Sequence, residues 1–152
     1  MSLRERFTDE LKASMRAGDS SRTSTLRMVL ARLKDTDIAA RPKGVTAIPD
    51  DEIVGMLRGM VKSRRESVAL YEQGNRPELA AKEAAEIAVI ESFLPQAMDD
   101  AALAAEVEAA VASTGASSQK EIGKVMAALK AKHGAALDMA RAGALVRARL
   151  TT

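Results

Sequence analysis

Three features of the 152-residue chain predict an all-α fold. Alanine occurs 30 times, and the other frequent residues (Leu, Met, Glu, Arg and Lys) also favour helices. Apolar positions recur with the helical period in every segment, and no alternating strand pattern occurs. Rings are scarce, with two Phe, one Tyr and no Trp, so the eight Met are expected to fill the cores as adaptable thioethers. We expect an N-terminal bundle of about four helices over 1–95 and a small three-helix tail domain over 96–152.

Capping residues and helix breakers delimit the N-terminal bundle. Ser2 and Glu5 match a Ser-x-x-Glu capping box, and the helix that it opens should stop at Gly18. The other helices of this bundle are expected over about 20–40, 50–73 and 77–93. Because residues before a proline leave the helical region, we place the domain boundary at Leu94-Pro95. The side chains expected to face the core are Leu3, Phe7, Leu11 and Met15, then Leu26, Val29, Leu30 and Leu33, and then Ile53, Met56, Leu57, Met60 and Val61.

The tail domain carries similar signals. Its helices are expected from Asp99 or Asp100 to Gly115, from a second capping box (Ser118 to Glu121) to His133-Gly134, and over about 138–150. The buried stripe of the middle helix should be Ile122, Val125, Met126 and Leu129. The seven-residue spacing of Arg27, Lys34 and Arg41 places these three side chains on the solvent face of the second helix.

The residues offer little for catalysis. The chain has no cysteine, and its one histidine, His133, is expected to act at the C-terminal end of its helix. Glu83 and Glu86 could serve acid–base chemistry or a divalent cation, but ion pairs with Arg64 or Arg65 are the favoured interpretation. No glycine-rich phosphate-binding motif occurs. We therefore predict no catalytic residue, no metal and no cofactor.

The charge of the chain changes in its last quarter. From 117 to 152 there are seven Lys/Arg and two Asp/Glu, a local +5 in a chain whose total is +2. Such a basic helical segment indicates contact with a polyanion. Gly123, inside a helix, should permit close approach of another helix or of a ligand, and helix packing is the favoured reason. Since rings are scarce, any RNA contact should use phosphates, 2′-hydroxyls and shape.

An ordered set of short segments resembles the GatB/YqeY family. The segments are Leu26-Arg-Met-Val-Leu-Ala31, Asp51-Glu-Ile53, Lys62-Ser-Arg-Arg-Glu66, Tyr71-Glu-Gln-Gly74, Glu83-Ala-Ala-Glu-Ile87, Phe93-Leu-Pro95, Gly123-Lys-Val-Met126 and Leu145-Val146. The resemblance runs through nearly the whole chain and is to a stand-alone YqeY-like protein. Many relatives have an Asp-Gly pair where Asp138-Met139 stands here, so the loop at 134–139 should be reshaped.

The resemblance implies a helical domain and tail similar to the C-terminal part of the B subunit of the glutamine-dependent aminoacyl-tRNA amidotransferase. In that enzyme the tail contacts folded tRNA, while the chemistry lies in other domains. The implied function is a tRNA-binding or amidotransferase-associated module without its own catalytic centre. The implied partners are tRNA and an amidotransferase or aminoacyl-tRNA synthetase, with no DNA. The expected RNA face is Lys120, Gly123, Lys124, Lys130, Lys132 and Arg147, with Arg27 and Lys34 as a secondary basic patch.

Two other functions stay open. A protein-interaction module would show an exposed apolar groove near Met56, Met60 and Met98. An autonomous carbon–nitrogen ligase that uses glutamine as amido donor, as the family could imply, would turn over ATP or glutamine. No segment approaches the roughly 20 apolar residues of a membrane span, and the mixed-charge start is unlike a signal peptide. No membrane partner is expected, and a cytoplasmic location is predicted.

Overall fold

A computed structural model describes residues 1–95, 98–134 and 137–150, and within these ranges every regular element is helical. The prediction of an all-α fold is confirmed. The elements are α1 (Leu3–Arg16), α2 (Ser20–Ala40), η1 (Arg41–Lys43), α3 (Asp50–Gln73), α4 (Pro77–Glu91), α5 (Asp100–Thr114), η2 (Gln119–Glu121), α6 (Ile122–His133) and α7 (Met139–Arg149). The chain forms two compact units, Met1–Leu94 and Pro95–Thr152, each with its own core.

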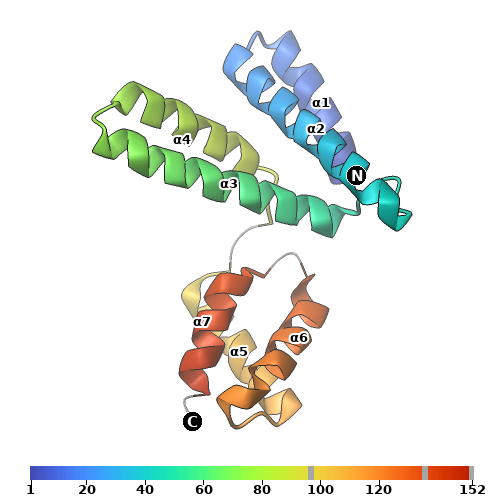
Figure 1. Ribbon diagram of the computed structural model, residues 1–152, viewed down its shortest axis with the longest axis vertical. Coiled ribbons are helices and arrows are strands. Elements are labelled where there is room, and N and C mark those ends of the chain that lie inside the picture. The colour runs from blue at the N-terminus through green and yellow to red at the C-terminus, as the bar shows by residue number, and fades with distance from the viewer. Residues whose placement is uncertain (96–97, 135–136, 151–152) are drawn as a thin grey trace. The chain divides into compact units, whose positions relative to one another are not determined.

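The first unit consists of two helical hairpins, α1 with α2 and α3 with α4 (Figure 1). The capping box predicted at its start is present, since Glu5 N–H donates to Ser2 Oγ (3.2 Å) and Ser2 N–H to Glu5 Oε2 (2.8 Å). The fully buried side chains that join the helices are Phe7, Leu26, Val29, Ile53, Leu57 and Ile90. The hairpins therefore share one core, which α2 and α4 help to close.

One core prediction in α1 is wrong. Met15 is 54% exposed, and Ser14 is buried in its place, with its hydroxyl 2.8 Å from that of Thr23. The reason is geometric: each four-residue step turns about 40° beyond a full helical turn, so by the third step a side chain lies about 120° from the first. Leu3 and Phe7 face the core, but Met15 has rotated out of it.

Asp37 ties α1, α2 and the loop before α3 together. Its carboxylate accepts from Arg4 Nη1 (2.8 Å), Arg4 Nη2 (2.7 Å) and the Ile48 backbone N–H (2.9 Å). Arg4 Nη2 also donates to the Ile48 carbonyl (3.0 Å), and the Leu3 N–H donates to Asp50 (3.1 Å). These bonds fix the start of α1 to the segment that leads into α3.

Replacing Asp37 by asparagine should lower the free energy of unfolding at pH 7 by about 2 kcal/mol. The Arg4 guanidinium, and next the Ile48 N–H, hold the pKa of the Asp37 carboxyl at about 2, below its usual 3.8. Because the folded-state pKa is depressed, this stabilisation is present at neutral pH and is lost as the pH falls from about 4 to about 2. Urea unfolding at pH 7 and at pH 2 checks this, because the gap between wild type and variant should close in acid. An equal gap at both pH values would contradict the role of the charge.

Candidate nucleic-acid interface

The second unit packs α5, α6 and α7 around an aliphatic core. Its members are Leu103, Val107, Ala110, Val111, Ala116, Val125, Leu129, Leu137, Ala142, Val146 and Leu150. The stripe predicted for α6 is confirmed, because Val125 and Leu129 are in this core and Ile122 and Met126 pack against it. Burial of this stripe turns the opposite side of α6 to solvent.

The start of α6 is set by a capping box at η2, as predicted. Glu121 Oε2 accepts from the backbone N–H groups of Ser117 (2.6 Å) and Ser118 (3.4 Å). These bonds, with that from Ser117 first, lower the pKa of Glu121. The cap fixes the first turn, so that Lys120 in η2 and Lys124 in α6 both project to solvent.

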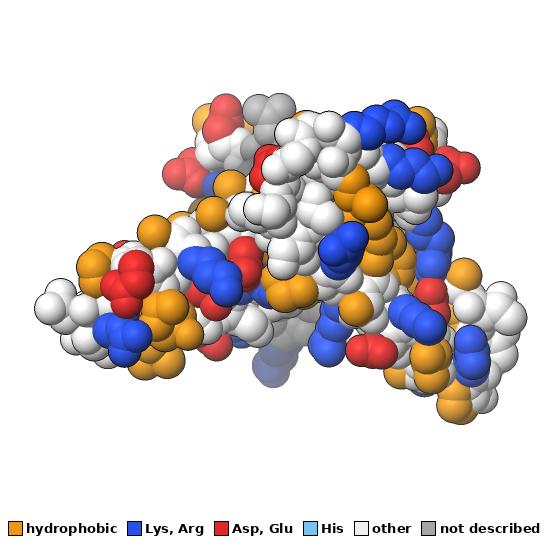
Figure 2. Space-filling model, turned by 90° about the horizontal axis from the view of Figure 1, so that it is seen from above, with side chains coloured by type: hydrophobic (Ala, Val, Ile, Leu, Met, Phe, Trp, Pro, Cys, Tyr) orange, Lys and Arg blue, Asp and Glu red, His pale blue; other side chains and the backbone are white. Residues whose placement is uncertain are grey.

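The carboxylates of α5 take up three of the seven cations between 117 and 152. Lys132 pairs with Glu106 (3.1 Å), Arg141 with Asp100 (2.6 Å) and Arg149 with Glu108 (2.6 Å). Over 95–152 the sequence has seven Lys/Arg and six Asp/Glu. The local +5 that suggested a polyanion partner is thus largely offset within the folded unit. Basic and acidic side chains are also interspersed over the face of the molecule that Figure 2 shows.

His133 also belongs to the α5 contact. Its Nε2 lies 2.7 Å from Glu106 Oε2, and its side chain is mostly buried. Lys132, and next His133, lower the pKa of Glu106. His133 lies in the last turn of α6, as predicted, and its ring in addition bonds to the neighbouring helix α5. Within the described ranges no cluster of His, Cys, Asp and Glu could hold a metal ion.

Four cations of the predicted RNA face are exposed and have no ion pair within the part of the chain that the structure describes. They are Lys120, Lys124, Lys130 and Arg147. The Arg147 guanidinium lies against α7, with Nη1 3.5 Å from the position of a β-carbon built on Gly143. The Met126 methyl lies 3.8 Å from the same position, so Arg147 is beside the seam between α6 and α7. Lys130 follows Met126 by about one turn of α6.

Gly123 does not serve helix packing, so the favoured explanation for it is wrong. The residue is exposed, and a β-carbon built on it meets nothing within 4 Å among the described atoms. With Ala127 and Ala131 it forms a strip of small, exposed residues along α6 at four-residue intervals. By helical geometry the strip lies between Lys124 on one side and Lys130 on the other, and Lys120 lies in η2, just before the start of the strip. A ligand backbone could therefore come close to α6 between the ammonium groups of these lysines.

The family profile described as Yqey-like protein matches residues 4–150. The chain belongs to the Yqey-like family. Among curated proteins, this Yqey-like chain is 32% identical over 86 residues to altered inheritance of mitochondria protein 41 of Kluyveromyces lactis, covering 55% of the chain and 44% of the relative. The Vanderwaltozyma polyspora protein of that name is 29% identical over 85 residues, covering 56% and 44%. The one of Lachancea thermotolerans is 29% identical over 104 residues, covering 68% and 53%.

The Yqey-like chain thus spans about half the length of these fungal relatives, whose names carry the word mitochondrial. In the described part of the chain, no helix is long and apolar enough to cross a membrane.

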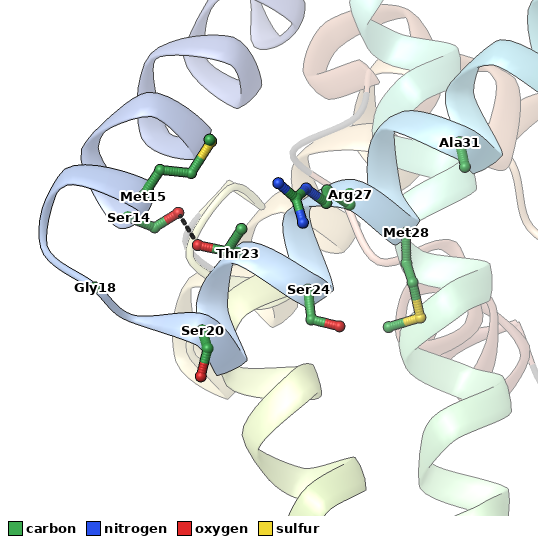
Figure 3. A pocket seen from close by; sticks show the side chains of 9 residues that line it. All are labelled: Ser14, Met15, Gly18, Ser20, Thr23, Ser24, Arg27, Met28 and Ala31. Atoms are coloured by element: carbon green, nitrogen blue, oxygen red, sulfur yellow. Dashed lines mark hydrogen bonds between the residues drawn. The ribbon is translucent and has the colours of Figure 1, made fainter.

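The secondary basic patch lies in the first unit of the Yqey-like chain. Arg27 and Lys34 are exposed on α2, without ion pairs among the residues described. Arg27 borders a hollow of about 590 Å³ beside α1 and α2, next to Met28 and Ser24 (Figure 3). Both side chains of the patch are therefore accessible, and the neighbours of Arg27 are methionines and hydroxyls.

The glutamates of α4 have the structural role that was favoured for them. Arg64 Nε lies 3.1 Å from Glu86 and 4.0 Å from Glu83, and Arg65 pairs with Glu91. These ion pairs hold α3 against α4. Glu83 and Glu86, the carboxylates considered for acid–base chemistry, are both engaged by Arg64. Met56 and Met60 border an open hollow, as a protein-interaction module would require. Met98 does not, because it packs against the core of the second unit.

Proposed function

We propose that this Yqey-like protein binds folded tRNA through Lys120, Lys124, Lys130 and Arg147, without a catalytic centre of its own. The observation that carries the proposal is that these four cations are exposed and make no ion pair within the described part of the second unit, with the three lysines around the small-residue strip of α6 and Arg147 beside the seam between α6 and α7. Ammonium and guanidinium groups so placed match phosphate oxygens on either side of a closely approaching backbone.

Lys132 has a secondary place in this face. Its ammonium group is bonded to Glu106, which cancels part of its long-range attraction for phosphate. An exposed ion pair contributes only about 0–1 kcal/mol, so an arriving phosphate can compete with Glu106 for Lys132. Arg27 and Lys34 keep their role as a secondary patch, which is expected to add affinity but no specificity.

The choice of tRNA rests on the resemblance of the tail to that of the amidotransferase B subunit. An amidotransferase or an aminoacyl-tRNA synthetase is the partner protein that this function implies, and a cytoplasmic location is proposed with it. The fungal relatives named as mitochondrial suggest that proteins of this kind also serve in mitochondria.

A carbon–nitrogen ligase is the alternative function. Turnover of ATP or glutamine by the purified chain would support the ligase and contradict the proposal of a module without a catalytic centre.

Labelled unacylated tRNA should bind the full chain at about 50 mM salt and lose roughly 50- to 150-fold in affinity by about 200 mM, as expected for about four phosphate contacts. Fluorescence anisotropy measures this, with a DNA duplex of similar length as the matched polyanion. Tighter binding to tRNA than to the duplex is expected from 2′-hydroxyl and shape recognition. No binding at low salt, or equal binding of both polymers, would refute tRNA recognition.

A further inference from the structure

The first unit has a second surface, which tRNA binding does not use. An open hollow of about 720 Å³ lies between α2 and α3. The wall formed by α2 consists of Met28, Ala31, Arg32 and Asp35, so it is mixed in polarity. Met28 and Ala31 also line the neighbouring hollow shown in Figure 3. An occupant of the hollow between α2 and α3 must therefore make apolar contacts and match charges of both signs.

Three charged side chains line this hollow, and two of them are available to a partner. Arg64 Nε lies 3.1 Å from Glu86 Oε2, so the charge of Arg64 is already matched. Arg32 and Asp35 are exposed and make no ion pair among the residues that the structure describes. They lie three residues apart on α2, hence on one side of the helix. The hollow thus presents an available cation and an available anion side by side.

The same side of α2 carries exposed apolar residues. Met28, Ala31, Asp35 and Ile38 recur at alternating steps of three and four residues, the spacing with which helices pack against each other. All four side chains are exposed, and Met28 and Ile38 are large hydrophobic residues. This side of α2 therefore has the pattern of a helix-packing surface, with Asp35 in its middle.

The α3 wall leaves room for another helix beside α2. Gly55 and Gly59 are exposed, and β-carbons built on them meet nothing within 4 Å among the described atoms. Ser63, exposed about one turn further along α3, continues this row of small residues. These residues give space, whereas the charges of α2 determine what kind of helix fits.

We propose that a second copy of this chain docks in the hollow, with the α2 helices of the two copies antiparallel about a two-fold axis. An axis perpendicular to α2 and midway between Arg32 and Asp35 sets Arg32 of each copy against Asp35 of the other. Both available charges are matched in this way, and Met28 of each copy comes level with the exposed Ala39 of the other. The interface is then mixed in polarity on both sides, as the lining of the hollow requires.

Other occupants match the hollow less well. A helix whose charges are all of one sign would set a like charge against either Arg32 or Asp35. RNA would meet the Asp35 carboxylate, and the lining offers a base no aromatic ring for stacking. The basic patch of Arg27 and Lys34 lies about 100° around α2 from Met28 and Asp35, so it stays open in the dimer. Association of two copies therefore does not depend on tRNA.

Sedimentation velocity of the full chain without RNA, over a range of protein concentrations, tests this dimer. The wild type should sediment faster as its concentration rises, because two copies associate. Arg32→Asp gives each copy two acids at the interface, and Asp35→Arg gives each copy two cations, so each variant should self-associate at least about tenfold more weakly. An equimolar mixture of the two variants should associate as well as the wild type, since the two acids of one copy then meet the two cations of the other.

Matched controls make the same charge changes elsewhere in the first unit. Lys82→Asp on α4 and Asp9→Arg on α1 alter exposed residues that do not line the hollow, and both variants should associate like the wild type. All four substitutions are at exposed positions, so the thermal midpoints should stay near the wild-type value. The proposal is overturned by sedimentation that does not depend on concentration, by undiminished association of either α2 variant, or by a mixture that stays monomeric. A folding defect cannot explain recovery in the mixture, because mixing changes neither chain.

Discussion

Replacing Phe7 by alanine is expected to lower the free energy of unfolding of the first unit by about 4 kcal/mol, the largest stability effect that we predict. Phe7 is fully buried, and its ring meets that of Phe93 edge to face with centroids 4.9 Å apart. The substitution therefore removes both the apolar contact of α1 with the core and its contact with the segment that follows α4.

The loss should be confined to the first unit, since each unit has its own core. Tyr71 is the single tyrosine and there is no tryptophan, so tyrosine fluorescence reports unfolding of the first unit alone. The Met126 methyl signal reports on the second unit. Leu70→Ala, at a residue that is 67% exposed, should change stability by less than about 0.5 kcal/mol. A Phe7→Ala chain in which both units melt together at a lower temperature would contradict independent cores.

Changing Lys120 and Lys124 together to glutamate should weaken tRNA binding by about 100-fold at low salt. Both side chains are exposed beside the small-residue strip and make no ion pair among the described residues, so their charge is available to phosphate. Reversal removes two attractions and adds two repulsions. Neither lysine is in the core, so circular dichroism and the thermal midpoint should stay near the wild-type values.

The matched control changes net charge by the same amount elsewhere. Arg149→Glu with Lys82→Glu alters one cation that already pairs with Glu108 and one exposed lysine of α4. Binding should fall by less than about threefold, because neither residue belongs to the RNA face. If both double variants lose affinity equally, net charge alone governs binding and no specific face exists.

Local sequence signals were enough to predict the helices. They were not enough to predict contacts between residues that are distant in the sequence. Capping boxes at Ser2 and Ser118 and breakers such as Gly18 set the helix ends, because they act within one turn. The i, i+4 pattern misplaced Met15, since that spacing drifts around a helix. The Asp37 junction joins residues 33 positions apart, and no local pattern indicates such a pair.

In the candidate site, too, local patterns predicted some features, while others depended on contacts within the folded unit. Exposure of Lys120 and Lys124 followed from the apolar stripe of α6, which the sequence displays. The ion pairs of Lys132, Arg141 and Arg149 could not be predicted in this way, because the acids that pair with them lie in α5, outside the basic segment 117–152. Counting Asp100, Glu106 and Glu108 in the same domain would have given that signal. The role of Gly123 depended on what lies around it, which only the folded unit reveals.

The dependence of tRNA affinity on salt tests most directly whether the four free cations bind phosphates. For the wild type, a plot of log K against log salt concentration should have a slope of about −3 to −4, and the Lys120→Glu, Lys124→Glu variant should lower the magnitude of that slope by about 2. A wild-type slope near zero, or the same slope for both proteins, would contradict the account.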